Sequence, residues 1–105
     1  MSRNVLLLLW AAQLPCNGLG YLVCYAYFGP VSDLGFTYVQ NLARAWADEE
    51  LGTTSKYVEN VFWLPESGQK EVMDGFISDN CDLIVTGSDT LQSLTKEYAD
   101  KSVVE

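Results

Sequence analysis

The sequence predicts one α/β domain built on a doubly wound parallel sheet with the strand order 2-1-3-4. Three observations lead to this prediction. Short apolar runs with a strand pattern alternate with longer segments in which apolar residues recur at helical spacing. The turns between these segments are short, which is typical of parallel strands joined by helical crossovers. The length of 105 residues suits one small domain, and an apolar fraction of 49% allows a real core.

The first strand and helix are the most clearly marked elements. A strand is expected over residues 21–28, an apolar run that stops at Gly29. A polar turn follows over residues 31–35, and a helix is expected over residues 36–51, before Gly52. Its apolar positions recur at helical spacing, as in a helix that packs one face on a core: Phe36, Val39, Leu42, Ala43 and Trp46.

The rest of the chain repeats the alternation of strand and helix. The expected elements are a strand over residues 56–61, a helix over 68–80 capped by Ser67, a strand over 81–86, a helix over 90–98 and a strand over 102–104. Two large aromatic residues, Phe62 and Trp63, lie in the loop before Pro65. They form either an exposed surface for a ligand or partner, or a lid on the sheet edge.

The first twenty residues differ from the rest and are predicted to be a secretory signal peptide. Arg3 precedes an apolar run over residues 5–12, which is too short to span a bilayer. The alternative is a native buried strand. Pro15 stands where a lipoprotein signal has a small residue, which argues against lipidation of Cys16. We therefore expect a signal peptide over residues 1–20 and one domain over residues 21–105.

Composition excludes several classes of function. The net charge is −8 and only six residues are basic, so nucleic acid is not an expected partner. The chain has no histidine, which removes His-based catalytic triads and most zinc or iron sites, and no metal or cofactor is expected. Cys24 and Cys81 lie in apolar runs and are expected to be small buried hydrophobic residues. A disulfide between them is an alternative that the pattern does not favour.

Polar side chains follow the first and third predicted strands. In the order 2-1-3-4 these strands are neighbours, and their crossovers leave on opposite faces, which opens a crevice at the carboxyl ends. The candidate ligand-binding residues at this crevice are Ser32, Asp33, Phe36, Thr86, Ser88 and Asp89. Carboxylates accept paired hydrogen bonds from vicinal hydroxyls, and an aromatic ring can stack on a base. A sugar or nucleoside therefore suits the site, whereas phosphate does not.

Each of these residues also has a purely structural explanation. Asp33, Ser88 and Asp89 can act as helix caps, and a cap can still offer a free oxygen to a ligand. Phe36 can pack in the core. No pattern of catalytic residues is present, and we expect no enzyme activity.

Residues 27–38, which read Tyr-Phe-Gly-Pro-Val-Ser-Asp-Leu-Gly-Phe-Thr-Tyr, resemble the first strand and turn of the basic membrane protein family. These are substrate-binding proteins of ABC transporters, related to purine-nucleoside receptors. The runs over residues 57–61, 81–86 and 96–100 are similar to that family in the same order, so that the resemblance covers residues 21–105.

This resemblance implies part of the N-terminal lobe of a type I periplasmic-binding fold. It also implies an exported protein, periplasmic or at the cell surface and membrane-associated, that binds a purine nucleoside or base and passes it to an ABC permease. Asp33 matches the aspartate of the family's first turn, Phe36 the aromatic residue that packs on the base, and Asp89 a later aspartate.

The chain departs from the family pattern in ways that bear on function. It lacks a short aromatic-glycine stretch between Ser88 and Asp89, and residues of a second lobe have no counterpart. One wall of a cleft should bind its ligand weakly or not at all. The alternative function is an interaction module or diverged fragment outside transport that self-associates through an uncovered sheet edge. A flavodoxin-like enzyme or receiver domain fits less well.

Overall fold

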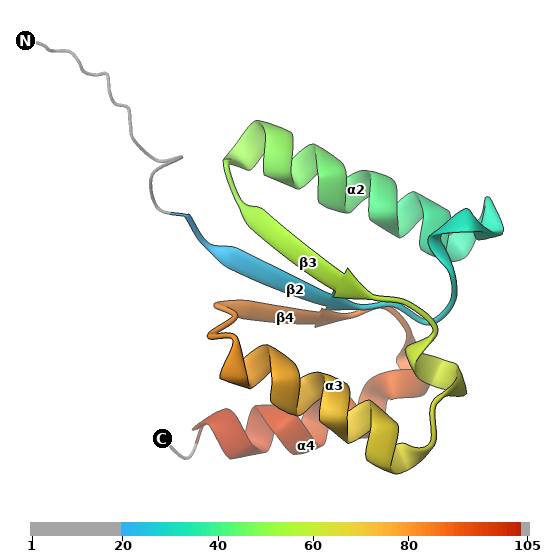
Figure 1. Cartoon of the computed structure of the whole chain (residues 1–105), viewed down its shortest axis with the longest axis vertical. Coiled ribbons are helices and arrows are strands. Elements are labelled where there is room, and N and C mark those ends of the chain that lie inside the picture. Colours follow the sequence, from blue (N-terminus) through green and yellow to red (C-terminus); the bar gives the residue numbers. More distant parts are fainter. Residues whose placement is uncertain (1–19, 104–105) are drawn as a thin grey trace, which may run out of the picture.

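The computed structural model describes residues 20–103. Its sheet has three parallel strands in the order β3-β2-β4: β2 (Leu22–Ala26), β3 (Thr54–Val58) and β4 (Leu83–Thr86). Figure 1 shows helix α2 (Phe36–Leu51) on one face of the sheet, and helices α3 (Glu66–Ser78) and α4 (Gln92–Val103) on the other. The predicted α/β class with a parallel sheet between helices is confirmed. The predicted signal peptide lies outside the described residues, apart from Gly20.

The predicted fourth strand is wrong in the part that the structure describes. Helix α4 continues through Val103, and Val104 lies outside the described residues. Contacts one helical turn apart favour the longer helix: Lys101 pairs with Glu97 and lies 4.2 Å over the ring of Tyr98. A base in the last turn also suits the negative end of the helix dipole. The three described strands take the order 2-1-3, and the fourth position of the predicted order 2-1-3-4 is not confirmed.

Neighbouring strands β2 and β4 lead into helices on opposite faces, as Figure 1 shows for α2 and α4. This arrangement is the topological switch at which open α/β sheets bind ligands. The register pairs Ala26 with Thr86, so both strands end at the same level. The segments after β2 and β4 therefore start side by side at the carboxyl edge of the sheet.

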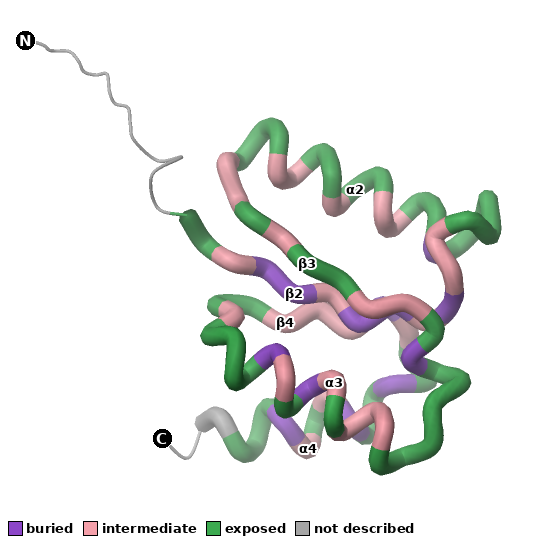
Figure 2. The backbone as a smooth tube through the Cα atoms, viewed as in Figure 1, coloured by how far each residue is buried: buried purple, intermediate pink, exposed green. Residues whose placement is uncertain are grey.

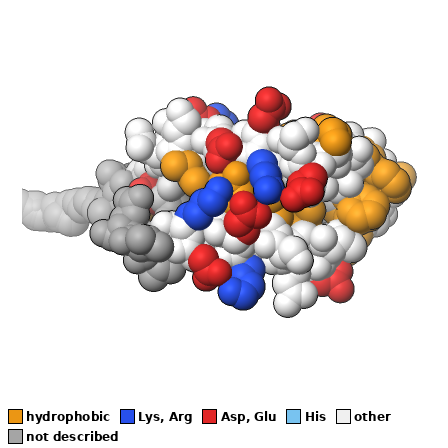
Figure 3. Space-filling model, turned by 90° about the horizontal axis from the view of Figure 1, so that it is seen from below, with side chains coloured by type: hydrophobic (Ala, Val, Ile, Leu, Met, Phe, Trp, Pro, Cys, Tyr) orange, Lys and Arg blue, Asp and Glu red, His pale blue; other side chains and the backbone are white. Residues whose placement is uncertain are grey.

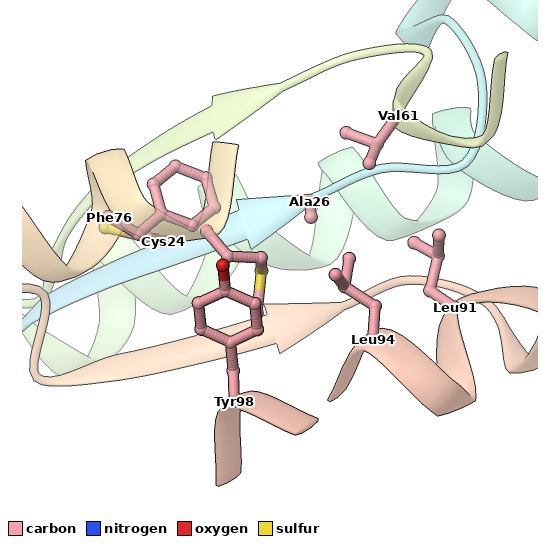
Figure 4. Close-up of a cluster of buried hydrophobic side chains, with 8 residues drawn as sticks. Cys24, Ala26, Val61, Phe76, Leu91, Leu94 and Tyr98 are labelled. Carbon is pink, nitrogen blue, oxygen red and sulfur yellow. The ribbon is translucent and has the colours of Figure 1, made fainter. Parts of the chain in front are cut away.

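The core lies between the sheet and the helices α3 and α4 (Figures 2 and 4). Its buried side chains are Cys24, Ala26, Val61, Met73, Phe76, Leu91, Leu94 and Tyr98. Cys24 forms a disulfide with Cys81, with their Cα atoms 6.0 Å apart. The expectation of two unbonded cysteines is therefore wrong. The sequence separation of 57 residues gave no sign of this contact, which depends on β2 and β4 being neighbours.

Helix α2 has the predicted bounds but presents the opposite face to the sheet. Its apolar stripe points outward, with Phe36 58% and Trp46 58% exposed. Its polar face lies on the sheet, where Arg44 sits 4.9 Å over the ring of Tyr57 and donates a 2.8 Å hydrogen bond to Ser55 Oγ. The expectation that the apolar stripe packs on a core is wrong.

The sheet itself explains this orientation of α2. The residues of β2 and β3 on the α2 side include Tyr25, Tyr57 and Ser55, and Tyr27 continues this face beyond β2. Their hydroxyl groups need hydrogen-bond partners when a helix covers them. Tyr27 donates to Asn41 Oδ1 at 3.2 Å, one of several polar contacts that an apolar helix face would leave unmade.

Other predicted boundaries shift by a few residues. β3 ends at Val58 because Asn60 takes a left-handed conformation with φ of 61°, and Val61–Trp63 form a 3₁₀ turn, η3. Helix α3 begins at Glu66 after Pro65, and no side chain caps it, so the cap predicted at Ser67 is wrong. β4 starts two residues later than predicted, and a 3₁₀ turn, η4 (Asp89–Leu91), precedes α4.

Candidate functional site

Asp33 closes the turn between β2 and α2. It ends the 3₁₀ turn η2 (Val31–Asp33) and caps the first turn of α2 with both carboxylate oxygens. Oδ1 accepts hydrogen bonds from the backbone N–H groups of Gly35 at 2.8 Å and Tyr38 at 3.0 Å, and Oδ2 accepts one from Thr37 at 3.1 Å. These backbone donors, with that of Gly35 first, lower the pKa of Asp33. Asp33 is therefore a charged helix cap, and little of its hydrogen-bonding capacity is left for a ligand.

Phe36 and Ser32 lie on either side of this cap. Phe36 is the first residue of α2 and is 58% exposed, so its alternative role as a core residue is wrong. Ser32 is exposed on η2. The ring of Phe36 is therefore accessible for stacking at the start of α2, the helix that follows β2.

Thr86, Ser88 and Asp89 form the second half of the predicted site, after β4. Together with three residues of α4 they line an open depression of about 600 Å³. The six lining residues are Thr86, Ser88, Asp89, Gln92, Thr95 and Lys96. Ser88 Oγ accepts a hydrogen bond from the N–H of Thr90 at 3.2 Å and so caps η4, as its structural explanation predicted.

The hydroxyl of Thr86 is set up to accept hydrogen bonds. Thr95 Oγ1 donates its hydrogen to the carbonyl of Leu91 at 2.8 Å. Thr86 Oγ1 must therefore be the donor in its 2.7 Å hydrogen bond to Thr95 Oγ1. A ligand group beside Thr86 must therefore be a donor, such as a hydroxyl or an amine.

One residue that the sequence reasoning missed, Gln40, links the two halves. Its Nε2 donates to the carbonyl of Gly87 at 3.0 Å, which ties the second turn of α2 to the tip of β4. Gly87 in turn donates its N–H to Ala26 O of β2 at 2.9 Å. A Cβ atom at Gly87 would collide with Gln40 Oε1, so the contact needs glycine here. No local sequence signal identifies Gln40, because its partner Gly87 lies 47 residues further along the chain.

The structure therefore places all six predicted residues at the carboxyl end of the sheet, but in two groups. Ser32, Asp33 and Phe36 follow β2, and the depression beside β4 is lined by Thr86, Ser88 and Asp89 without them. The Gln40–Gly87 hydrogen bond is the direct link between the groups. The two predicted carboxylates, Asp33 and Asp89, therefore belong to different groups.

Aromatic rings form a third feature at this end of the molecule. Phe62 stacks on Phe28, with ring centroids 4.6 Å apart, and Trp63 meets Phe62 edge-on at 4.9 Å. Trp63 is 67% exposed. Of the two interpretations open for Phe62 and Trp63, the exposed surface fits the 67% exposure of the Trp63 ring.

Comparisons with known proteins add no identification. No protein-family model and no curated protein matches this sequence. In the part of the chain from 20 to 103, no group of three or more side chains is arranged to hold a metal ion. Over the same residues, none of the helices combines the length and apolar character needed to cross a bilayer.

Proposed function

We propose that this chain is part of an extracytoplasmic solute-binding protein of an ABC transporter, and that the carboxyl edge of β2 and β4 binds a purine nucleoside or base. The domain would correspond to part of the N-terminal lobe of a type I periplasmic-binding fold, and the protein would pass its ligand to a permease. It acts as a binding protein, without enzyme activity. The resemblance of residues 21–105 to the basic membrane protein family supplies the ligand class.

One structural observation carries the proposal. Phe36, which is exposed, begins the helix that follows β2, and Thr86, with its acceptor hydroxyl, ends the neighbouring strand β4. Gln40 of the same helix donates a hydrogen bond to the carbonyl of Gly87, the residue after Thr86. A nucleoside offers a flat base to the ring and donor hydroxyls to Thr86 and to the carboxylate of Asp89. Phosphate would meet the negative charges of Asp33 and Asp89, which disfavours a nucleotide.

The disulfide supports the cellular location in this proposal. Disulfides persist in oxidising compartments and are rare in the reducing cytosol. The Cys24–Cys81 bond joins two neighbouring strands at the core, so it belongs to the folded domain itself. This fits export directed by residues 1–20 to the periplasm or cell surface, with the domain held near the membrane by its permease.

Binding by this chain alone should be weak. The depression at β4 is open, and the Phe36 ring contacts solvent over most of its surface, so one wall supplies few contacts. We expect a dissociation constant of about 1 mM or weaker for guanosine or adenosine. This strength suits a titration followed by amide chemical shifts in ¹⁵N-labelled protein.

The test compares guanosine, adenosine and cytidine against the wild type and two variants. Purine nucleosides should shift the amides of Thr37, Tyr38 and Ser88, and Phe36→Ala should abolish these shifts. Val39→Ala is the matched control, since Val39 lies one turn further along α2 and is 61% exposed. Amide shifts that persist in Phe36→Ala would contradict a purine site. So would amide shifts of equal size with cytidine and with the purine nucleosides.

A second candidate function is self-association through the edge of β4 that pairs with no other strand among residues 20–103, and one observation favours it. A groove of about 590 Å³ runs between β4, α3 and α4, lined by Met73, Ile77 and Leu83 among others, and Leu83 is 56% exposed. Unpaired strand edges promote association between chains. Sedimentation of the wild type and Leu83→Lys tests this function. A dimer that Leu83→Lys dissociates would favour it, and a monomeric wild type would exclude it.

A further inference from the structure

The outer face of α2 carries an apolar stripe without a partner in the described structure. Four large side chains on this face are more than half exposed: Phe36 58%, Val39 61%, Leu42 51% and Trp46 58%. Figure 2 shows exposed positions recurring along the whole length of α2. The exposed parts of these side chains add up to about 400 Å² in one stripe, which is in the range of the largest apolar patch on a typical monomer, a patch that is often functional.

The polar face of α2 prevents the helix from rolling to hide this stripe. Asp48 accepts a hydrogen bond from Thr53 Oγ1 at 2.6 Å, and Arg44 donates to Asn41 Oδ1 at 2.8 Å and to Ser55 Oγ at 2.8 Å. Rotation of α2 about its axis would break these contacts and leave charged groups unpaired against the sheet. The sequence itself therefore fixes the stripe on the outside.

The charged groups at the two ends of the stripe are negative. Glu49 and Glu50 lie exposed in the last turn of α2, and Asp33 lies exposed before its first turn. Among residues 20–103, each basic side chain is already paired with another acid: Arg44–Asp48, Lys56–Asp79, Lys70–Glu66 and Lys70–Glu97, Lys96–Asp100, Lys101–Glu97. Figure 3 shows the opposite face, where basic and acidic side chains alternate.

These charges discriminate between the occupants that an apolar stripe can have. An antiparallel pair of α2 helices from two copies would bring Glu49 and Glu50 of one copy beside Asp33 of the other, at both ends. The first-turn amides of Thr37 and Tyr38 already bond Asp33 and cannot receive a second carboxylate. A membrane with anionic lipids would meet the same repulsion. Positive charge on the partner is therefore required.

We propose that the outer face of α2 binds a cationic amphipathic helix of another protein. Its apolar side would lie on the stripe, with lysine or arginine residues at both ends facing Asp33 and the pair Glu49 and Glu50. The 16 residues of α2 make a helix about 24 Å long, so the partner needs about four turns. A standard interface takes about 800 Å² per partner, somewhat more than half of it apolar, which the stripe nearly supplies.

The test uses two synthetic helical peptides with the same leucine stripe. One carries lysines at both ends, and the other carries glutamates there. Fluorescence anisotropy of the labelled peptides measures binding to the full chain and to three variants. Leu42→Gln/Trp46→Gln removes the middle of the stripe, and Glu49→Gln/Glu50→Gln removes charge. Ile77→Gln is the control, because Ile77 is 49% exposed on α3. Circular dichroism checks that each variant is folded.

We expect the lysine peptide to bind about tenfold more tightly than the glutamate peptide, because rim charges add a modest amount at each end. Leu42→Gln/Trp46→Gln should weaken it about tenfold or more, Glu49→Gln/Glu50→Gln about threefold, and Ile77→Gln not at all. Equal binding of both peptides, or binding that survives Leu42→Gln/Trp46→Gln, overturns the proposal.

Other occupants of the stripe give distinct results, and each overturns the proposal. A dimer in sedimentation that Leu42→Gln/Trp46→Gln dissociates assigns the stripe to a second copy. Binding to phosphatidylserine vesicles that depends on the same two residues assigns it to a membrane. Peptide binding that appears only after deletion of residues 1–19 assigns it to the apolar segment of this chain.

Discussion

Reduction of the Cys24–Cys81 disulfide should remove a large part of the domain's stability. The bond joins residues 57 apart in the sequence. Closing a loop of this length limits the unfolded chain, and the loss of that constraint costs about 4 kcal/mol in the chain-entropy treatment. A domain of this size has a total unfolding free energy of about 4–12 kcal/mol. The reduced protein should therefore lie close to the margin of folding.

Urea unfolding of the oxidised and reduced protein measures this difference directly. Reduction by dithiothreitol keeps every atom of Cys24, which is 0% exposed, so no cavity confuses the result. Cys24→Ala/Cys81→Ala should lose somewhat more stability, because it also removes buried atoms. Cys16→Ser is the control. Its unfolding free energy should equal that of the wild type when both are oxidised, and again when both are reduced.

A difference below about 1 kcal/mol between the oxidised and reduced protein would refute this reasoning about the loop. Two free thiols at Cys24 and Cys81, found by mass spectrometry after refolding in oxidised and reduced glutathione, would contradict the bond itself. That second result would also remove the support that the disulfide gives to an extracytoplasmic location.

Three further predictions concern single positions. Gly87→Ala should displace Gln40 and break its hydrogen bond to Gly87 O, at a cost of about 1 kcal/mol in urea unfolding. The same substitution should cost almost nothing in a Gln40→Ala background, and an unchanged cost there would contradict the steric explanation. Burial, with the hydrogen bond to Asp74 Oδ1 at 2.8 Å, raises the pKa of Tyr98 from 10.0 to about 12. Because the folded pKa lies above the unfolded one, this contribution to stability is complete below pH 10.0 and is lost as pH rises through about 12. Tyr98→Phe should abolish the highest step in a spectrophotometric titration of the folded protein, and a titration without that step in the wild type speaks against the raised pKa. Leu34 is 80% exposed at a φ of 56°, so Leu34→Gly should raise stability by about 0.5 kcal/mol, and a loss of stability would rule out the left-handed conformation.

The arrangement of strands was predictable because local patterns and general rules determine it. Alternation of apolar runs and amphipathic segments identified β2, β3 and β4, and the doubly wound topology gave their order. The bounds of α2 followed from its periodicity and from Gly52, which ends the helix at a φ of 73°. The cap formed by Asp33 was one of two roles that its position before a helix allowed.

Most of the errors arose where long-range contacts decide the outcome. An apolar stripe identifies a helix, but whether it faces inward depends on what the sheet offers, here the hydroxyls of Tyr27 and Ser55 and the ring of Tyr57. The disulfide depends on which strands are neighbours. The error at α4 is a local one: side chains one turn apart, such as Glu97 and Lys101, outweigh the strand preference of Val103. Gln40 has no motif, because its contact to Gly87 crosses 47 residues.

The most direct test of the proposed binding edge is a nuclear Overhauser measurement on the full chain with a large excess of adenosine. If one nucleoside bridges the ends of β2 and β4, its base protons should give cross-peaks to the Phe36 ring and its ribose protons to the Thr86 methyl group. Cross-peaks to the Trp63 ring alone, or none to either Phe36 or Thr86 under these conditions, would contradict the proposal that this edge is the ligand site.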